Sequence, residues 1–295
     1  MMIRLSKRFN DFIEKSLSLD WHETIGPLEI SEDDLFNRNI GKRSENLFMG
    51  YFSVNGLKII LDRYKISSKL AKKGFTNLKV EINTTDPYKH KFILKNTTGE
   101  AEEKLIELVL RRDYITVDMP FNTPLNGRKL EALVVEWLKM QNPRTGFTRG
   151  KSRLPGQDYP GLGIGSEALE LLVLAAHRLG LHAIINIPDH YHNAFLYSKI
   201  FNYEKPYDQA KLAAIMRDTK KYDVSEVAWA IEEKALLDVN GLKPVDWFVA
   251  KQVFPLYKEW VYLYKSNRYR YEVYKEMKKF KFKIDKNWIN RRKYL

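Results

Sequence analysis

The 295-residue chain contains no cysteine, so disulfide bonds and thiol chemistry are excluded. This absence is typical of proteins from a reducing compartment, and we expect a cytoplasmic location. No run of about 18 apolar residues is free of charge, which predicts that no segment spans a membrane. The first residues contain no uninterrupted apolar segment, which argues against a secretory signal.

Apolar residues are plentiful: 44% of the chain is hydrophobic and 13% is aromatic, enough for a sizeable core. The net charge of +13 is unevenly distributed. Residues 255–295 carry 13 Lys and Arg against 4 Asp and Glu, so this segment alone contributes +9. Such a basic segment suits nucleic acid, an acidic partner or an anionic surface, and is also typical of a solvated helix.

The patterns along the chain divide it into three parts. Residues 1–45 predict a helical arm, residues 46–205 an α/β core, and residues 206–295 a basic helical extension. In the core, "LFMGYFSV" and "GLKIIL" predict short strands, with a helix over "RYKISSKLAKKGF". "NLKVEIN", "HKFILKN" and "KLIELVLRRDYITV" predict consecutive strands, and the turn signal "NTTGE" predicts a hairpin between the last two.

The stretch Leu130–Pro143 fits both a helix face and a buried strand, and we favour the strand. After it come a Gly/Pro/basic loop, a helix over Ser166–Leu179 and a strand over His182–Pro188. An order of strand, loop, helix and strand implies a crossover connection, and therefore a mixed or parallel sheet.

Three alternate glycines, Gly161, Gly163 and Gly165, precede the predicted helix. Glycine has no side chain to cover the backbone, and a helix N-terminus offers unpaired N–H groups. This loop is therefore suited to bind a pyrophosphate through backbone hydrogen bonds. A tight turn without a ligand would give the same pattern. No Lys-Ser/Thr pair follows the glycines, which excludes a P-loop, and "RLPGQDYP" does not form the strand that a Rossmann loop requires.

This loop and helix, followed by a strand and "NAFLYSKIFNYEKP", resemble the acetyl-CoA core of the GNAT superfamily of N-acyltransferases, in a bacterial-type form. Pro160 stands where the family usually has Arg or Gln, and the loop over residues 144–157 is longer than usual. The resemblance implies a GNAT-like mixed sheet flanked by helices. It also implies transfer of an acetyl or other acyl group from acyl-CoA to an unidentified amine.

The resemblance further implies roles for individual residues. Tyr197 would give a proton to the leaving thiolate, and Glu136 would be the base, with a pKa raised by partial burial. Asn193 would bind the pantetheine arm, or would be a helix N-cap without a ligand. The residues expected to hold the CoA pyrophosphate are Gly161, Leu162, Gly163, Ile164, Gly165 and Ser166.

Two other patterns leave alternatives open. His190 and His192 have only Asp189 as a neighbouring ligand type, so we expect no metal site. The aromatic and basic residues after Glu259 suit stacking on nucleic acid bases, or a helix packed on the core or on a second subunit of a homodimer. The alternative function is therefore a catalytically silent GNAT-shaped protein whose basic extension contacts nucleic acid or an acidic protein.

Overall fold

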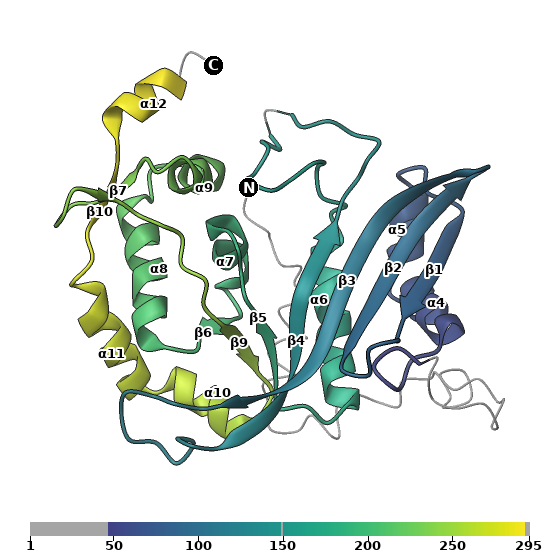
Figure 1. Ribbon diagram of the computed structural model, residues 1–295, viewed down its shortest axis with the longest axis horizontal. Coiled ribbons are helices and arrows are strands. Elements are labelled where there is room, and N and C mark those ends of the chain that lie inside the picture. Colours follow the sequence, from purple (N-terminus) through teal and green to yellow (C-terminus); the bar gives the residue numbers. More distant parts are fainter. Residues whose placement is uncertain (1–46, 149, 293–295) are drawn as a thin grey trace.

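The computed structural model describes residues 47–148 and 150–292 and shows an α/β protein, with a mixed sheet flanked by helices (Figure 1). The predicted helical arm over residues 1–45 lies outside the described residues. The central sheet has the order β1-β2-β3-β4-β5-β9-β6. Its strands are β1 (Leu78–Asn83), β2 (Lys89–Thr98), β3 (Ala101–Thr116), β4 (Lys129–Met140), β5 (Ala183–Asn186), β6 (Asn202–Tyr203) and β9 (Gln252–Pro255).

A smaller sheet has the order β10-β7-β8, and helices lie before, between and after the strands. The small strands are β7 (Leu236–Asp238), β8 (Lys243–Pro244) and β10 (Phe282–Ile284). The helices are α4 (Val54–Arg63), α5 (Ile66–Ala71), α6 (Gly165–Arg178), α7 (Tyr191–Tyr197), α8 (Pro206–Asp218), α9 (Val224–Glu232), α10 (Lys258–Lys265), α11 (Asn267–Met277) and α12 (Lys286–Arg292).

The first four strands form an antiparallel meander; the sequence predicts consecutive strands here and the hairpin between β2 and β3. The β2–β3 hairpin turns at Gly99, whose φ of +60° is a conformation that glycine adopts without strain, so the predicted turn is confirmed. The ambiguous stretch after Leu130 forms β4, which confirms the strand. Its residues Ala132, Leu133 and Val134 are all buried, because both faces of the sheet are covered there.

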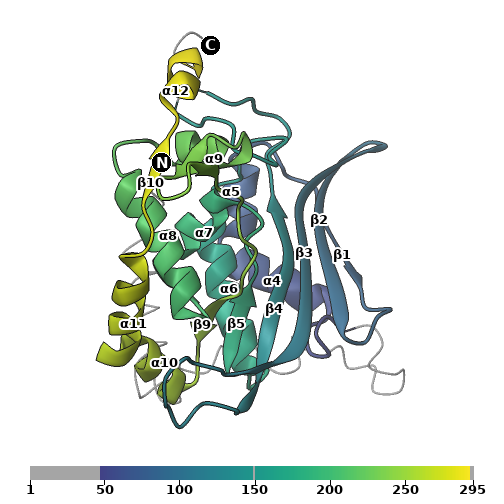
Figure 2. The ribbon, with the colours of Figure 1, turned by 60° about the vertical axis from the view of Figure 1, so that its left-hand side comes forward.

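Helix α6 connects β4 to β5, and these two strands are parallel, so the predicted crossover is confirmed. All other neighbours in the central sheet pair antiparallel. Helices α4, α5 and α6 pack on one face of β1–β4, while α10 packs on the opposite face near β5 and β9 (Figure 2).

The strand predictions for "LFMGYFSV" and "GLKIIL" are wrong. The first segment forms a turn closed by an isolated bridge between Phe48 and Phe52, and the second belongs to helix α4. Ser53 begins that helix, and its Oγ accepts a hydrogen bond from the Gly56 amide at 3.0 Å. Leu57, Ile60 and Leu61 then recur at helical spacing and pack in the core. The N-cap and the helical period outweigh the β propensity of the two isoleucines.

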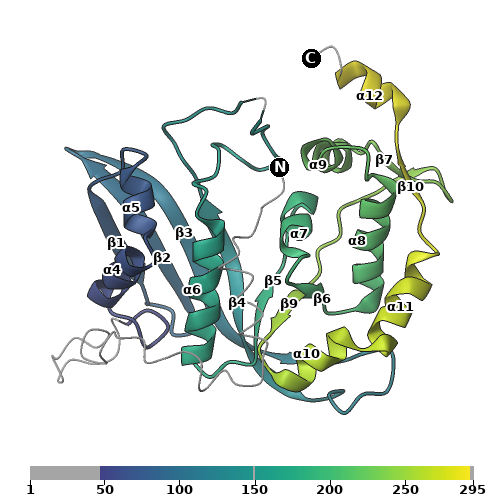
Figure 3. The same ribbon diagram turned by 180° about the vertical axis from the view of Figure 1, so that it is seen from behind.

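The C-terminal part is less purely helical than predicted. After α8 and α9 the chain forms β7 and β8, and then returns as β9 between β5 and β6 of the central sheet (Figure 3). All four residues of β9 are buried. A four-residue strand has too short a pattern to be recognised from sequence, and its burial is decided by distant elements.

The outer edge of the central sheet is closed by side chains. The backbone N–H of Tyr203 in β6 donates to Gln209 Oε1 at 2.8 Å, and its carbonyl accepts from the Tyr269 hydroxyl at 2.8 Å. An open edge exposes unpaired backbone groups, so these two bonds replace a missing neighbouring strand. They also attach helices α8 and α11 to the sheet.

We expect Tyr269→Phe to lower the free energy of unfolding by about 1–2 kcal/mol, because it leaves the buried Tyr203 carbonyl without its donor. Denaturant unfolding measures this change. Tyr271→Phe on the same helix is the matched control and should have almost no effect, since Tyr271 is 57% exposed. Equal effects of the two variants would show that the bond does not hold the sheet edge.

Candidate functional site

The candidate site lies where two parallel strands part. Strands β4 and β5 pair only from Ala132 opposite Ala183 to Val135 opposite Asn186. Beyond that point β5 ends, whereas β4 continues to Met140 along β3. The strands therefore form a fork whose open end lies beside the N-terminus of α6 (Figure 3).

A bulge in β4 lies at the fork. Val135 pairs with Leu110 and Trp137 with Val109, so Glu136 is the extra residue between them. A bulge redirects side chains locally and is common next to functional sites. Glu136 thus lies at the position where β4 and β5 begin to diverge.

Glu136 is held by two cations rather than buried in apolar surroundings. Lys89 Nζ lies 2.5 Å from Glu136 Oε2, and Arg111 Nε donates to Oε1 at 2.7 Å. The hydrogen bond from Lys89, assisted by the one from Arg111, lowers the pKa of Glu136 below its usual value. The expectation that burial raises this pKa is therefore wrong, because the two ion pairs outweigh desolvation.

The glycine loop leads into α6 with its backbone exposed to open space. Gly163 has a φ of +71°, and a Cβ added to Gly163 or Gly165 would meet no atom within 4 Å. The neighbouring Leu162 and Ile164 are buried in the core and anchor the loop. The glycines therefore lie on the side of the loop that faces open space, while Leu162 and Ile164 anchor the opposite side in the core.

Within the described residues, no side chain caps the N-terminus of α6. The N-cap residue Ile164 has no side chain that could accept a hydrogen bond, and the intrahelical bonds start with Ala168 N to Ile164 O at 3.0 Å. The carboxylate of Glu167 in the first turn is paired with Lys69 at 2.5 Å. This end of the helix keeps the positive potential that attracts an anion.

The long loop before the glycines crosses toward α7 and α9. Trp229 Nε1 donates to the Arg153 carbonyl at 2.8 Å, and Leu154 packs on the cluster formed by α7, α8 and α9. Gly156 has a φ of +73°, and a Cβ there would lie 2.8 Å from His190 Nε2. A side chain at position 156 would clash with His190, so this close contact requires glycine. Through this contact the loop covers the side of the fork nearest α7.

Helix α7 carries Asn193 and Tyr197 one turn apart, as predicted. The N-cap of this helix is His190, so the alternative in which Asn193 is the N-cap is wrong. Tyr197 packs against the core cluster that contains Leu162 and Ile164 of the glycine loop, with its ring 5.7 Å from that of Phe201. Burial raises the pKa of Tyr197, so its phenol stays protonated at neutral pH.

A row of buried polar side chains crosses the sheet at the fork, and it was not predicted from sequence. Asn186, Gln252 and Tyr203 are direct cross-strand neighbours on β5, β9 and β6. All three are buried, and Asn186 Oδ1, Gln252 Oε1 and the Tyr203 hydroxyl have no hydrogen-bond partner among the described residues. Such groups are rare in protein interiors and often mark functional positions. The signal in the sequence was Asn186, a polar residue that interrupts the apolar run "AIINIP".

The fork separates the two predicted catalytic residues. Asn186 shares its sheet face with Val135, Ile184 and the helices α6 and α7, and Tyr197 packs on that same side. Glu136 bonds to Arg111, which pairs with Val134 on the opposite face. A reacting group could contact both Glu136 and Tyr197 only if it lay between the diverging strands.

His190 and His192 lie on α7 with stacked rings, 5.4 Å apart. His192 is 3% exposed, and its Nδ1 has no partner among the described residues. Over residues 47–148 and 150–292, no group of three or more His, Cys, Asp or Glu could hold a metal ion. His190 is half-buried, and its Nδ1 lies 3.5 Å from Glu232 Oε2, so only His192 is buried in the described structure.

No protein-family model matches the chain, and no curated protein sequence matches it. Among the described helices, none combines the length and the apolar character needed to cross a bilayer.

The acid sensitivity of the fold provides a test of His192. Desolvation, with a smaller contribution from the charge of His190, lowers the pKa of His192 to about 4. The unfolded chain then binds more protons than the folded chain between about pH 6.5 and 4, so stability falls as the pH drops through this range. From pH 7 to pH 5 the loss from this residue is about 2 kcal/mol.

We therefore expect His192→Gln to flatten the decline in unfolding free energy between pH 7 and pH 5. Denaturant titrations at several pH values measure the difference. A decline as steep as that of the wild type would show that His192 is not buried in its neutral form.

Proposed function

We propose that this protein is an acyltransferase that moves an acetyl or other acyl group from acyl-CoA to an amine. The observation that carries the proposal is the fork, where the parallel strands β4 and β5 part beside the N-terminus of α6. In the loop that precedes this helix, no described side chain covers the backbone at Gly163 and Gly165. A pyrophosphate would lie at the loop, and the pantetheine arm would run between β4 and β5. The GNAT resemblance of the sequence implies the same arrangement.

Two parts of an acyl-CoA, the diphosphate and the pantetheine arm, find suitable groups in this arrangement. The amides from Gly163 to Ser166 suit the diphosphate, because backbone N–H groups at a helix N-terminus bind anions. Between Val135 and the bridge from Gln141 to Gly161, β4 has no partner strand among the described residues on the side from which β5 has departed. Its backbone groups there can pair with the amides of an extended pantetheine. Asn186, whose Oδ1 is unpaired, lies at the base of the same space.

The reaction requires three events. The amine must lose a proton, its nitrogen then attacks the thioester carbon, and the C–S bond breaks as the C–N bond forms. A thiolate leaves and must be stabilised and protonated. Most of the acceleration would come from holding the amine against the thioester in the fork.

Tyr197 is suited to stabilise the leaving thiolate as a hydrogen-bond donor. Its raised pKa lies above that of an ordinary thiol, so complete proton transfer from the phenol to sulfur is uphill. The phenol would donate a hydrogen bond as negative charge develops on sulfur, and solvent would supply the final proton.

The pKa of Glu136, in contrast, is lowered, which makes its carboxylate a weak base. Its charge is also compensated by Lys89 and Arg111, so Glu136 would have little attraction for a cationic amine.

The anion site can be tested at Gly165, the first residue of α6. Gly165→Asp puts a negative charge beside the bound diphosphate, where two unit charges 4 Å apart repel by about 4 kcal/mol at an effective dielectric constant of 20. We expect the affinity for acetyl-CoA, measured by calorimetry, to fall at least tenfold. The free energy of unfolding should not fall, because an acidic residue at a helix N-terminus is favourable.

Gly165→Asn is the matched control, since it has nearly the same size and no charge. It should lose much less affinity than Gly165→Asp. The absence of saturable acetyl-CoA binding by the wild-type protein would refute the proposed function.

Tyr197→Phe tests the role of the phenol. We expect the release of CoA thiol from acetyl-CoA, assayed with a panel of small primary amines, to fall about 100-fold, while the affinity for acetyl-CoA stays the same. Tyr191→Phe is the control: it removes a hydroxyl from the same helix, but the Tyr191 ring lies 5.8 Å from that of Trp247, within the cluster of α7, α8 and α9. Unchanged turnover in Tyr197→Phe would exclude this role.

A further inference from the structure

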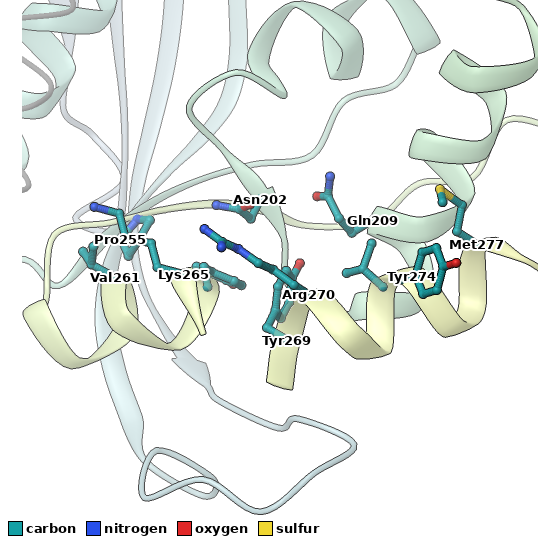
Figure 4. A pocket seen from close by; sticks show the side chains of 11 residues that line it. Asn202, Gln209, Pro255, Val261, Lys265, Tyr269, Arg270, Tyr274 and Met277 are labelled. Carbon is teal, nitrogen blue, oxygen red and sulfur yellow. The ribbon is translucent and has the colours of Figure 1, made fainter. Parts of the chain in front are cut away.

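A second site lies at the far edge of the central sheet. Helices α10 and α11, together with β6, β9 and α8, enclose a cleft of about 410 Å³, here called the α10–α11 cleft (Figure 4). This volume lies within the usual range for small-molecule sites. Most of its lining residues belong to the basic segment 255–295, to which the proposed acyl transfer assigns no role.

Two cations of the cleft are free of carboxylate partners. Lys265 ends α10 and Arg270 lies in the second turn of α11, and neither forms an ion pair with a carboxylate within the described ranges. Arg268 and Lys275 on the same helix, in contrast, both pair with Glu272. Among the residues that the structure describes, no Asp or Glu lines the cleft. The uncompensated charge of Lys265 and Arg270 therefore favours an anion.

The cleft also offers groups that suit a planar polar ring. Asn202 and Gln209 supply carboxamides, which can donate and accept hydrogen bonds as the edge of a base does (Figure 4). Gln209 accepts a bond from Tyr203 N through Oε1, which leaves its amide hydrogens as donors. Tyr274, 53% exposed, and Met277 form an aromatic and apolar wall at one end.

We propose that the α10–α11 cleft binds a nucleotide. Lys265 and Arg270 would hold the phosphate, since a guanidinium and an ammonium together match a phosphate group well. The base would lie against the Tyr274 side of the cleft and bond to the carboxamides. A free nucleotide and one residue of a single-stranded nucleic acid share this chemistry. The inference does not depend on the acyltransferase proposal.

Calorimetry with adenosine 5′-monophosphate, an adenylate hexamer and inorganic phosphate tests the inference on the full chain. We expect the double variant Lys265→Gln/Arg270→Gln to weaken binding of the monophosphate or the hexamer at least tenfold. The control Lys258→Gln/Lys283→Gln removes the same charge from exposed positions outside the cleft and should change affinity much less. For the hexamer, the slope of log affinity against log salt should decrease by about 1.4 in the double variant.

The outcomes separate the possible sources of the nucleotide. Binding of the monophosphate as tight as that of the hexamer indicates a free nucleotide, whereas binding of the hexamer alone indicates a strand. The inference is overturned if neither binds, if both pairs of substitutions weaken binding equally, or if inorganic phosphate binds as tightly as the nucleotides do.

Acetyl-CoA itself carries an adenosine phosphate, so the glycine loop needs its own control. Nucleotide binding should persist in Gly165→Asp, and acetyl-CoA binding should persist in Lys265→Gln/Arg270→Gln. A nucleotide that Gly165→Asp excludes, but that the double variant still binds, would lie at the glycine loop and would overturn the inference. Either proposal can therefore fail without the other.

Discussion

The pairing of β9 with both β5 and β6 is the interaction on which the rest of the structure depends. Strand β5 has four residues and pairs with β4 only along its own length. Without β9 on its other side it would be an edge strand, and β6 would have no neighbour. Because β9 comes from residues 252–255, the part of the chain after residue 205 completes the sheet that holds the fork. The attachment of α8 and α11 to the edge of β6 reinforces the same pairing.

The fork follows from a mismatch of strand lengths. Strand β4 runs to Met140 because β3 pairs with it throughout, whereas β5 stops at Asn186 as the chain turns into α7. The bulge at Glu136 increases the local bend in β4. Between Val135 and the bridge from Gln141 to Gly161, the backbone of β4 has no strand partner on the β5 side within the described residues. Buried polar side chains gather at the same level. A fold that leaves hydrogen-bonding capacity unused in its interior is suited to bind an extended polar ligand.

The two proposed sites use positive potential of different origin. At the glycine loop it comes from backbone amides and the helix end, and the nearby Lys69 is already paired with Glu167. In the α10–α11 cleft it comes from the side chains of Lys265 and Arg270. Charges on flexible, exposed side chains are screened by salt, whereas amides fixed in a loop need no rearrangement to bind. The two sites should therefore differ in the salt dependence of their affinities.

The sequence by itself determined the elements with strong local signals: the strands β1 to β3, the turn at Gly99, the crossover through α6 and the glycine loop at its start. It also placed Tyr197 one turn after Asn193. Turn residues, apolar periods and helix ends act over a few positions, so they can be read locally. Only the tertiary structure decided the partners of Glu136, the burial of Asn186, the position of β9 and the lining of the α10–α11 cleft. Each of these depends on strand register or on packing between residues far apart in the chain. Such contacts set the local dielectric environment and the neighbouring charges, and these determine the pKa and the chemical role of a side chain.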